Sequence, residues 1–340
     1  MTIDLAAYQS AVPDSIVARL AGARRVLTVS HENPDADTIG AALGVATLVE
    51  DHGGVADPLC SDPIPALYQF MPGSERFRTD PDPDAGYDLL VVLDCGSLDR
   101  IGEVGARNAD LFARLPMVVI DHHASNDAAG DTDWIDPGAA ATCEMVALLA
   151  GRLGVDLAAG DGALATNLMA GIVMDTATFA HPNVTPRTLA VSAALVEAGA
   201  PLSDISRRLY RSKPDAQLRL FGRALARLES ADDGRIVWSS LTDADLAEAG
   251  AERAHAEGII DLLSQAESAE VAILFKEAGQ RQTRISVRTR PGGLDATVLT
   301  GRFGGGGHAR AAGATVSAPL AEARPAVLAE ATRLVAEVSR

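Results

Sequence analysis

The sequence predicts an α/β protein in which a mostly parallel, doubly wound sheet is followed by a smaller α/β domain at the C-terminus. Apolar runs that end in Asp or His recur through the first half of the chain and alternate with helix-like segments. Runs without polar alternation are typical of strands that are buried on both faces. The length of 340 residues exceeds the size at which single cores usually stop growing, so two domains are expected.

Four apolar runs are the predicted strands or strand-like segments of the first domain. They are RRVLTVSH, YDLLVVLD, LPMVVID and LMAGIVMD, which end at His31, Asp94, Asp121 and Asp175. Helices are expected between such runs at 38–52 and 142–153, because Gly53-Gly54 and Gly154 provide stop signals after them.

The second half of the chain begins with an amphipathic helical stretch, which Pro201 and Pro214 divide. We predict a first domain at 1–190, a helical linker at 191–229 and a second domain at 230–340. RIVWSS, VAILFKE and RISVRT are its predicted strands, and 254–266 is its predicted helix. Asp233-Gly234 is a dipeptide typical of hairpins, but we interpret it as the opening of the second domain.

Composition and charge exclude several classes of protein. A formal net charge of −17 argues against a protein that binds duplex DNA, although bound cations can still make a cleft attractive to a short anionic substrate. No run approaches the roughly 18 apolar residues of a membrane span, and the first residues lack the order of a secretion signal, so we expect a cytoplasmic protein with no membrane partner. The three cysteines lack a C-x-x-C pair and are predicted to be reduced thiols.

Side chains that bind metals gather where the predicted strands end. Carboxyl ends of parallel strands meet at one edge of a sheet, where ligands bind. Five carboxylates at this edge would repel one another, and divalent cations would remove the conflict. Asp oxygens with His nitrogens and no thiolate favour Mn²⁺, Fe²⁺ or Co²⁺ over structural zinc. The set is His31, Asp35, Asp37, Asp94, Asp121, His122, His123 and Asp175.

Helix capping is the alternative explanation for these carboxylates. Taken alone, Asp37 or Asp121 would suit a helix cap or a residue that supports a ligand. Four segment ends that all carry ligand-type residues are harder to explain by capping. Two metal ions a few Å apart would suit phosphoester hydrolysis, since they can hold phosphate oxygens and activate water.

These motifs resemble those of a known family. HENPDADTIG, VVLDCGS, IDHHASN and GIVMDT resemble, in this order, the four motifs of the DHH phosphoesterase family. The resemblance implies two divalent ions, Mn²⁺ first among them, with Asp94 as the bridge between them and Asp175 completing the shell. It implies that one ion is held by His31 and Asp35 and the other by Asp37 and His122.

The resemblance also implies catalytic roles for Asp94, Asp121 and His123. His123 would face the substrate phosphate. Asp121 would fix the tautomer of a neighbouring histidine.

The C-terminal segment ISVRTRPGGLDATVLTGRFGGGGHARAAG resembles the substrate-binding domain of nanoRNases, RecJ-type exonucleases and cyclic-dinucleotide phosphodiesterases. A glycine-rich run alone is more often a flexible loop. Because HARAAG follows this run and an arginine-bearing strand precedes it, we predict a phosphate cradle. Its predicted substrate-binding residues are Arg288, Gly305, Gly306, Gly307 and His308.

One motif departs from the family pattern. Many relatives continue the fourth motif as D-T-G-x-F-R, whereas this chain reads DTATFA from Asp175 to Ala180. An arginine contact to substrate is therefore missing, and whether His181 or Arg187 replaces it stays open.

The resemblance implies a homodimeric, Mn²⁺-dependent phosphodiesterase and phosphatase. It would hydrolyse short oligoribonucleotides to 5'-monophosphates and would also act on linear or cyclic di-AMP and on 3'-phosphoadenosine 5'-phosphate. Two alternatives remain: a RecJ-like single-strand exonuclease, and a catalytically silent module that binds nucleotides for regulation.

Overall fold

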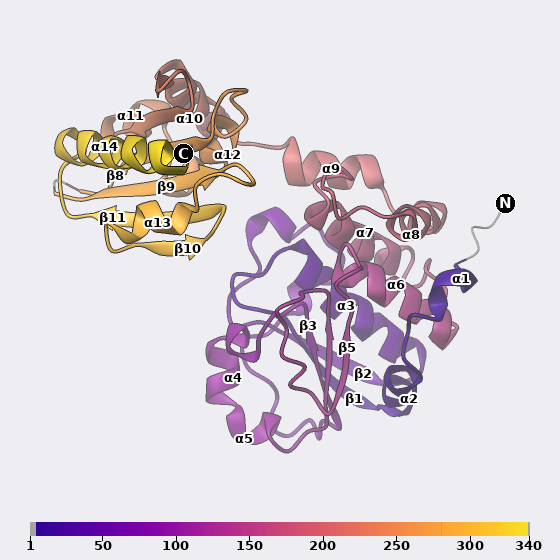
Figure 1. The fold of residues 1–340 in the computed structure, drawn as a ribbon. Helices are drawn as coiled ribbons and strands as arrows, with labels where there is room; N and C mark the ends of the chain where they lie inside the picture. The colour runs from indigo at the N-terminus through magenta and orange to yellow at the C-terminus, as the bar shows by residue number, and fades with distance from the viewer. Residues whose placement is uncertain (1–4, 280, 339–340) are drawn as a thin grey trace. The chain divides into compact units, whose positions relative to one another are not determined.

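The computed structural model describes residues 5–279 and 281–338, which form two compact units (Figure 1). The units divide between Ser212 and Lys213, inside the segment 191–229. In the described part of the chain no single helix has both the length and the apolarity needed to cross a bilayer. The helices α8 (Pro186–Glu197) and α9 (Leu202–Tyr210) meet both criteria only when they are taken together, and this pair is bent by 112°.

A five-stranded, entirely parallel sheet forms the centre of the first unit (Figure 1). The strand order β2-β1-β3-β4-β5 is doubly wound, and the winding reverses between β1 and β3. This confirms the predicted fold class. The strands are β1 (Arg25–Val29), β2 (Val55–Leu59), β3 (Leu89–Leu93), β4 (Met117–Asp121) and β5 (Thr132–Ile135).

Helices cover both faces of this sheet (Figure 1). The larger core lies under α3, α6 and α7, and a smaller core lies on the other face under η3, α4 and α5. Besides α8 and α9, the helices of this unit are α1 (Ala6–Gln9), α2 (Asp14–Gly22), α3 (Ala36–Asp51), η1 (Ala66–Tyr68), η2 (Ser74–Arg76), η3 (Leu98–Ile101), α4 (Glu103–Arg107), α5 (Ala109–Phe112), α6 (Thr142–Leu153) and α7 (Ala163–Asp175).

The prediction of a strand-like segment for the fourth apolar run was wrong. LMAGIVMD is the second half of α7, which is buried along nearly its whole length. A helix that is buried on all sides shows no polar face, so its sequence cannot be distinguished by periodicity from that of a buried strand. Gly171 lets α7 lie close to the edge where metal binding is predicted, since a Cβ there would collide with Asp37 and Cys143.

The second unit is built on a mixed six-stranded sheet with the order β10-β11-β9-β8-β7-β6. Only β7 and β8 run parallel. Helices α13 and α14 pack on one face, and α10 and α12 pack on the other. The elements are α10 (Asp215–Ala226), β6 (Glu229–Ala231), β7 (Ile236–Leu241), α11 (Asp243–Ala249), η4 (Arg253–Ala256), α12 (Ile259–Leu263), β8 (Val271–Glu277), β9 (Thr283–Thr289), α13 (Ala296–Gly301), β10 (Gly306–His308), β11 (Ala311–Val316) and α14 (Leu320–Val338).

Two predictions for this unit need correction. The helix expected at 254–266 is broken, because Gly258 takes a φ of 85° between η4 and α12. Asp233-Gly234 does form a hairpin turn, which joins β6 to β7; Asp232, Asp233 and Gly234 all have positive φ there.

Candidate metal centre

The predicted ligands converge beyond the carboxyl ends of β1 and β3, where the winding of the sheet reverses. His31 follows β1 and Asp94 follows β3 directly. Asp94 takes a φ of 59°, a left-handed conformation that Asp tolerates better than most residues. Such conformations occur preferentially at functional sites, where the surrounding structure holds them in place.

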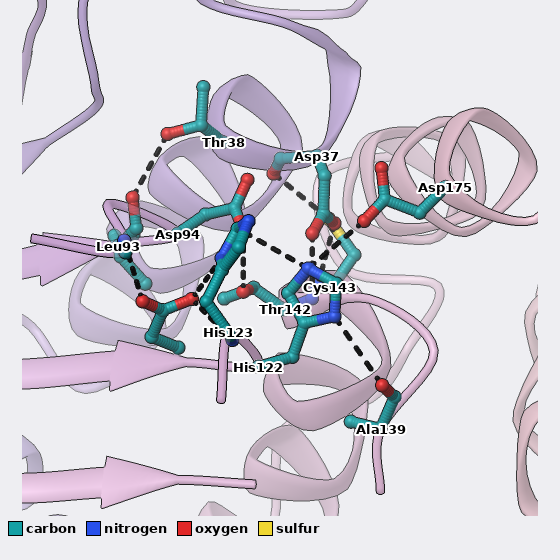
Figure 2. A network of polar contacts seen from close by, with 12 residues as sticks. Asp37, Thr38, Leu93, Asp94, His122, His123, Ala139, Thr142, Cys143 and Asp175 are labelled. Atoms are coloured by element: carbon teal, nitrogen blue, oxygen red, sulfur yellow. Dashed lines mark hydrogen bonds and ion pairs between the residues drawn. The ribbon is translucent and has the colours of Figure 1, made fainter. Parts of the chain in front are cut away.

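Three groups of ligand-type side chains lie at this edge, and in each group the donor atoms fall within 4.8 Å of one another. Asp94 belongs to two of the groups and so does His122, so the groups form one continuous centre, most of which is drawn in Figure 2. All six predicted metal ligands and His123 are therefore brought together. The groups are His31, Asp35 and Asp94; Asp37, His122 and Asp175; and Asp94, His122 and His123.

The orientation of His31 points its free ring nitrogen at carboxylates. Its Nδ1 lies 2.7 Å from the carbonyl oxygen of Glu32, so this nitrogen carries the proton of a neutral ring. Its Nε2 lies 3.9 Å from oxygens of both Asp35 and Asp94. A lone pair facing two carboxylates is repulsive unless a cation lies between them, so this arrangement fits a metal ion.

His122 also has one ring nitrogen near a carbonyl oxygen and the other near carboxylates (Figure 2). Its Nδ1 lies 3.4 Å from the carbonyl oxygen of Ala139. Its Nε2 lies 3.1 Å from Asp175 and 3.5 Å from Asp94. The two histidines thus approach the same carboxylate from different loops.

Backbone and side-chain donors fix the carboxylates. Asp35 caps the N-terminus of α3, where its Oδ1 accepts from the N–H of Asp37 at 2.9 Å. Asp37, in α3, instead accepts from the N–H groups of Thr142 at 2.6 Å and Cys143 at 2.9 Å. It thereby provides acceptors for the free backbone N–H groups in the first turn of α6. The hydroxyl of Thr142 donates to Asp94 at 3.0 Å.

Burial and mutual repulsion disturb the titration of these groups. Burial, reinforced by the charge of Asp175, raises the pKa of Asp37 to about 7. Burial and nearby carboxylates also raise the pKa of Asp94, and burial raises that of Asp175. Burial alone would lower the pKa of His122, but the hydrogen bond with Asp175 and the charge of Asp37 raise it to about 9. The centre thus holds more negative charge than it can stabilise without cations.

Asp121 differs from the other carboxylates because it belongs to none of the three groups. Its side chain is buried and accepts hydrogen bonds from the N–H of Gly96 at 2.7 Å, from Asn126 at 2.6 Å and from the N–H of His123 at 3.0 Å. Burial alone would raise the pKa of Asp121, but the hydrogen bonds from His123 and Asn126 bring it down to about 2. This environment suits an ionised residue that orients His123.

The residues that hold the loop before α6 were not predicted from the sequence. Glu144 is fully buried in α6 and pairs with Arg187, which also bonds Asp136 at 2.8 Å. A charged residue inside the apolar run TCEMVALLA was the available signal. Arg187 is thereby occupied, and the ring of His181 lies 3.0 Å from the carbonyl oxygen of Asp175.

In the second unit, Arg288 and His308 both pair with Ala311, from opposite sides. Cross-strand partners share a face, so both side chains lie on one face of the sheet. Gly305 and Gly307 are needed for packing, because a Cβ at either would collide with β11. A Cβ on Gly306 would meet no other atom within 4 Å. The side chain of Arg288 bonds Asp261 at 2.9 Å.

Comparison with known proteins agrees with this architecture. Residues 25–172 match the model of the DHH family, N-terminal domain, and residues 234–337 match that of the DHHA1 domain. An exopolyphosphatase-related protein from Bacteroides fragilis shares the fold, with a TM-score of 0.81 at 22% identity over 96% of this chain and 97% of that one.

Relatives named bifunctional oligoribonuclease and PAP phosphatase NrnA include the following two proteins. The protein from Thermus thermophilus is 31% identical over 86% of this chain and 84% of the relative. The protein from Bacillus subtilis is 26% identical over 84% of this chain and 87% of the relative. This chain therefore belongs to the DHH family, as the sequence predicted, and combines the N-terminal domain of that family with a DHHA1 domain.

Proposed function

We propose that this chain is a phosphoesterase that depends on two divalent metal ions. It releases 5'-monophosphates from short oligoribonucleotides and removes a phosphate from 3'-phosphoadenosine 5'-phosphate. The observation that carries the proposal is the sharing of Asp94 and His122 among the three ligand groups, which joins two candidate ion sites into one centre. The names of the NrnA relatives support this choice of substrates.

The donor set fits the ions. His31, Asp35 and Asp94 would hold one ion, and a second would be held by Asp37, His122 and Asp175, with Asp94 between them. Oxygen and imidazole nitrogen donors without a thiolate favour Mn²⁺, Fe²⁺ or Co²⁺ over structural zinc, and we propose Mn²⁺. When bound, the ions supply positive charge that polarises a phosphoryl group and lowers the pKa of water.

His123 is the candidate for direct contact with substrate. Its Nδ1 lies 2.7 Å from the ionised carboxylate of Asp121, which keeps the proton on that nitrogen. Its side chain is 37% exposed, while that of Asp94 is 3% exposed. His123 can therefore orient or protonate a phosphate oxygen while Asp121 stays buried behind it.

The second unit is proposed to bind a substrate phosphate. Arg288 and His308 would provide side-chain donors, and Gly305, Gly306 and Gly307 would provide a backbone that a phosphate can approach. Arg288 would have to exchange its bond with Asp261 for one with phosphate. We further propose that the protein forms a homodimer in the cytoplasm. We also propose that it hydrolyses linear and cyclic di-AMP.

The test is a kinetic comparison of substrates with defined Mn²⁺. Rates on RNA of two to twenty nucleotides, 3'-phosphoadenosine 5'-phosphate, and linear and cyclic di-AMP should be highest for the shortest RNAs and for the phosphatase substrate. Equal rates along the RNA series would favour a RecJ-like exonuclease. Tight nucleotide binding without turnover would favour the regulatory module.

The variant Asp94→Asn tests the centre itself. Asn tolerates the left-handed backbone at this position but removes the shared charge. Turnover should fall at least about 1000-fold, since both ions depend on this residue. Asp110→Asn, an exposed residue in α5, is the matched control and should keep full activity. Full activity of the Asp94 variant would rule out the shared role.

A further inference from the structure

We propose that Arg100 binds the scissile phosphate group of the substrate, a role that rests on the proposed function. Arg100 lies in η3, six residues after Asp94. Its carbonyl oxygen accepts the N–H of Glu32, the residue after His31, at 2.7 Å. The backbone of Arg100 thus joins the two loops that carry His31 and Asp94.

Further hydrogen bonds attach η3 to the segment after β2. The next carbonyl, that of Ile101, accepts the hydroxyl of Ser61 at 2.6 Å, and the same hydroxyl oxygen accepts the N–H of Val104 at 2.9 Å. Ile101 and Val104 are both buried. A side chain that starts from such a backbone is positioned before substrate arrives, which lowers the cost of binding.

The guanidinium of Arg100 lies near His123. A Cβ built on Gly96 would lie 3.8 Å from Nη1 of Arg100 and 3.6 Å from Cγ of His123. The two groups therefore border the position that a side chain at residue 96 would occupy. An anion that reaches His123 also comes within range of Arg100.

The donors of Arg100 are not used by the protein. Within residues 5–279 and 281–338, its side chain makes no hydrogen bond or ion pair, whereas the partly buried Arg25, Arg76 and Arg187 of the same unit pair with carboxylates. Arg100 is only partly exposed and lies in an acidic protein, beside a loop that carries Asp94. A guanidinium offers five donors in a fork that matches phosphate, and here that fork is free.

This role fills the gap left by the altered fourth motif. Ala180 stands where the D-T-G-x-F-R pattern has arginine. Neither alternative is free, because Arg187 bonds Glu144 and Asp136, and the ring of His181 bonds the carbonyl of Asp175. Arg100, which precedes the fourth motif in the sequence, supplies the missing positive charge.

The test compares Arg100→Ala, Arg100→Lys and the control Arg114→Ala with the unmodified protein. Arg114 is an exposed arginine just before β4, at the opposite edge of the sheet. With a diribonucleotide and Mn²⁺, Arg100→Ala should lower kcat/KM about 100-fold, and Arg100→Lys should recover part of the loss. Arg114→Ala should stay within about twofold.

Rescue separates phosphate binding from a structural role. Guanidinium ion added at millimolar concentration should restore activity to Arg100→Ala but not to Asp94→Asn, and the affinity of Arg100→Ala for Mn²⁺ and its melting temperature should match those of the unmodified protein. An Arg100→Ala variant within twofold of full activity, or one that fails to respond to guanidinium and binds Mn²⁺ weakly, would overturn the proposal. An unmodified protein that hydrolyses none of the substrates would instead refute the proposed function.

Discussion

Asp121 holds His123 through two contacts: its Oδ1 accepts the backbone N–H of His123 at 3.0 Å and lies 2.7 Å from the ring Nδ1. The carboxylate is fully buried and ionised, with its pKa lowered to about 2. Because the folded state binds this proton less tightly than the unfolded chain does, the carboxylate stabilises the protein above pH 4, and that stability is lost as the pH falls toward 2.

Asp121→Asn should therefore lower the free energy of unfolding by about 2 kcal/mol at pH 7, and the difference should halve near pH 3. In this variant the side-chain NH₂ group would face the N–H of Gly96 or the side-chain NH₂ of Asn126, which both donate to Asp121 in the unmodified protein. Two donors would then face each other. Urea unfolding in EDTA at pH 7, 5 and 3 measures this. Asp131→Asn is the control, since exposed Asp131 accepts one backbone N–H from Met117; an equal loss in both variants would contradict the prediction.

The metal-free centre should become less stable as the pH rises. The pKa of Asp37 is raised to about 7, so the folded protein holds this proton more tightly than the unfolded chain, and stability falls between about pH 4 and 7. The pKa of His122, raised to about 9, continues the fall above pH 6.5. The melting temperature of protein in EDTA should drop on the order of 10 °C from pH 5 to pH 8.

Saturating Mn²⁺ should reverse this trend, because bound ions replace the protons and bind more tightly as the ligands deprotonate. The increase in melting temperature on adding Mn²⁺ should be larger at pH 8 than at pH 5.5. Asp110→Asn should behave like the unmodified protein. A melting temperature in EDTA that stays constant from pH 5 to pH 8 would show that the carboxylates are not crowded.

Local sequence patterns predicted the three inner strands of the sheet and the gathering of the ligands, but not the edge strands β2 and β5. Three apolar runs end in β1, β3 and β4 or just beyond them, and parallel strands must present their carboxyl ends at one edge. The contacts that orient the ligands could not be predicted in this way. Asp37 and Thr142 bond across 105 residues, and no local pattern encodes such a pair. α7 was missed because complete burial removes helical periodicity.

Arg187 should control metal affinity through the loop before α6. Arg187 pairs with both Glu144 and Asp136. The segment between these two carboxylates includes Ala139, whose carbonyl oxygen contacts His122, and Thr142, whose N–H donates to Asp37. Arg187→Met leaves the buried charge of Glu144 unpaired and should cost about 3–5 kcal/mol of unfolding free energy. Arg207→Met, in an exposed pair with Asp204, should cost no more than about 1 kcal/mol.

The double variant Arg187→Met with Glu144→Met separates stability from positioning. It should recover most of the free energy of unfolding, since no buried charge is left unpaired. Its affinity for Mn²⁺ should remain about 10- to 100-fold weaker, because the loop has lost its tie to Asp136. Calorimetric titration with Mn²⁺ and urea unfolding measure the two quantities. Normal Mn²⁺ affinity in the double variant would restrict this ion pair to a structural role.

The segment after Asp175 carries backbone strain that one substitution should relieve. Ala177, Thr178 and Phe179 have φ values of 47°, 58° and 65°, which L-residues rarely adopt in succession. Glycine, which the family pattern places at position 177, adopts this conformation without a steric penalty. Ala177→Gly should therefore raise the free energy of unfolding by up to about 1 kcal/mol, the relief of strain exceeding the added entropy of the unfolded chain.

Ala180→Gly is the matched control, because Ala180 does not have a positive φ and should lose about 0.5–1 kcal/mol when replaced. Urea unfolding of both variants in EDTA gives the comparison. A loss of the same size at both positions would show that the left-handed turn is not strained. If Ala177→Gly is stabilised but its rate with a diribonucleotide falls, the strain serves to hold Asp175 in the geometry that the metal centre needs.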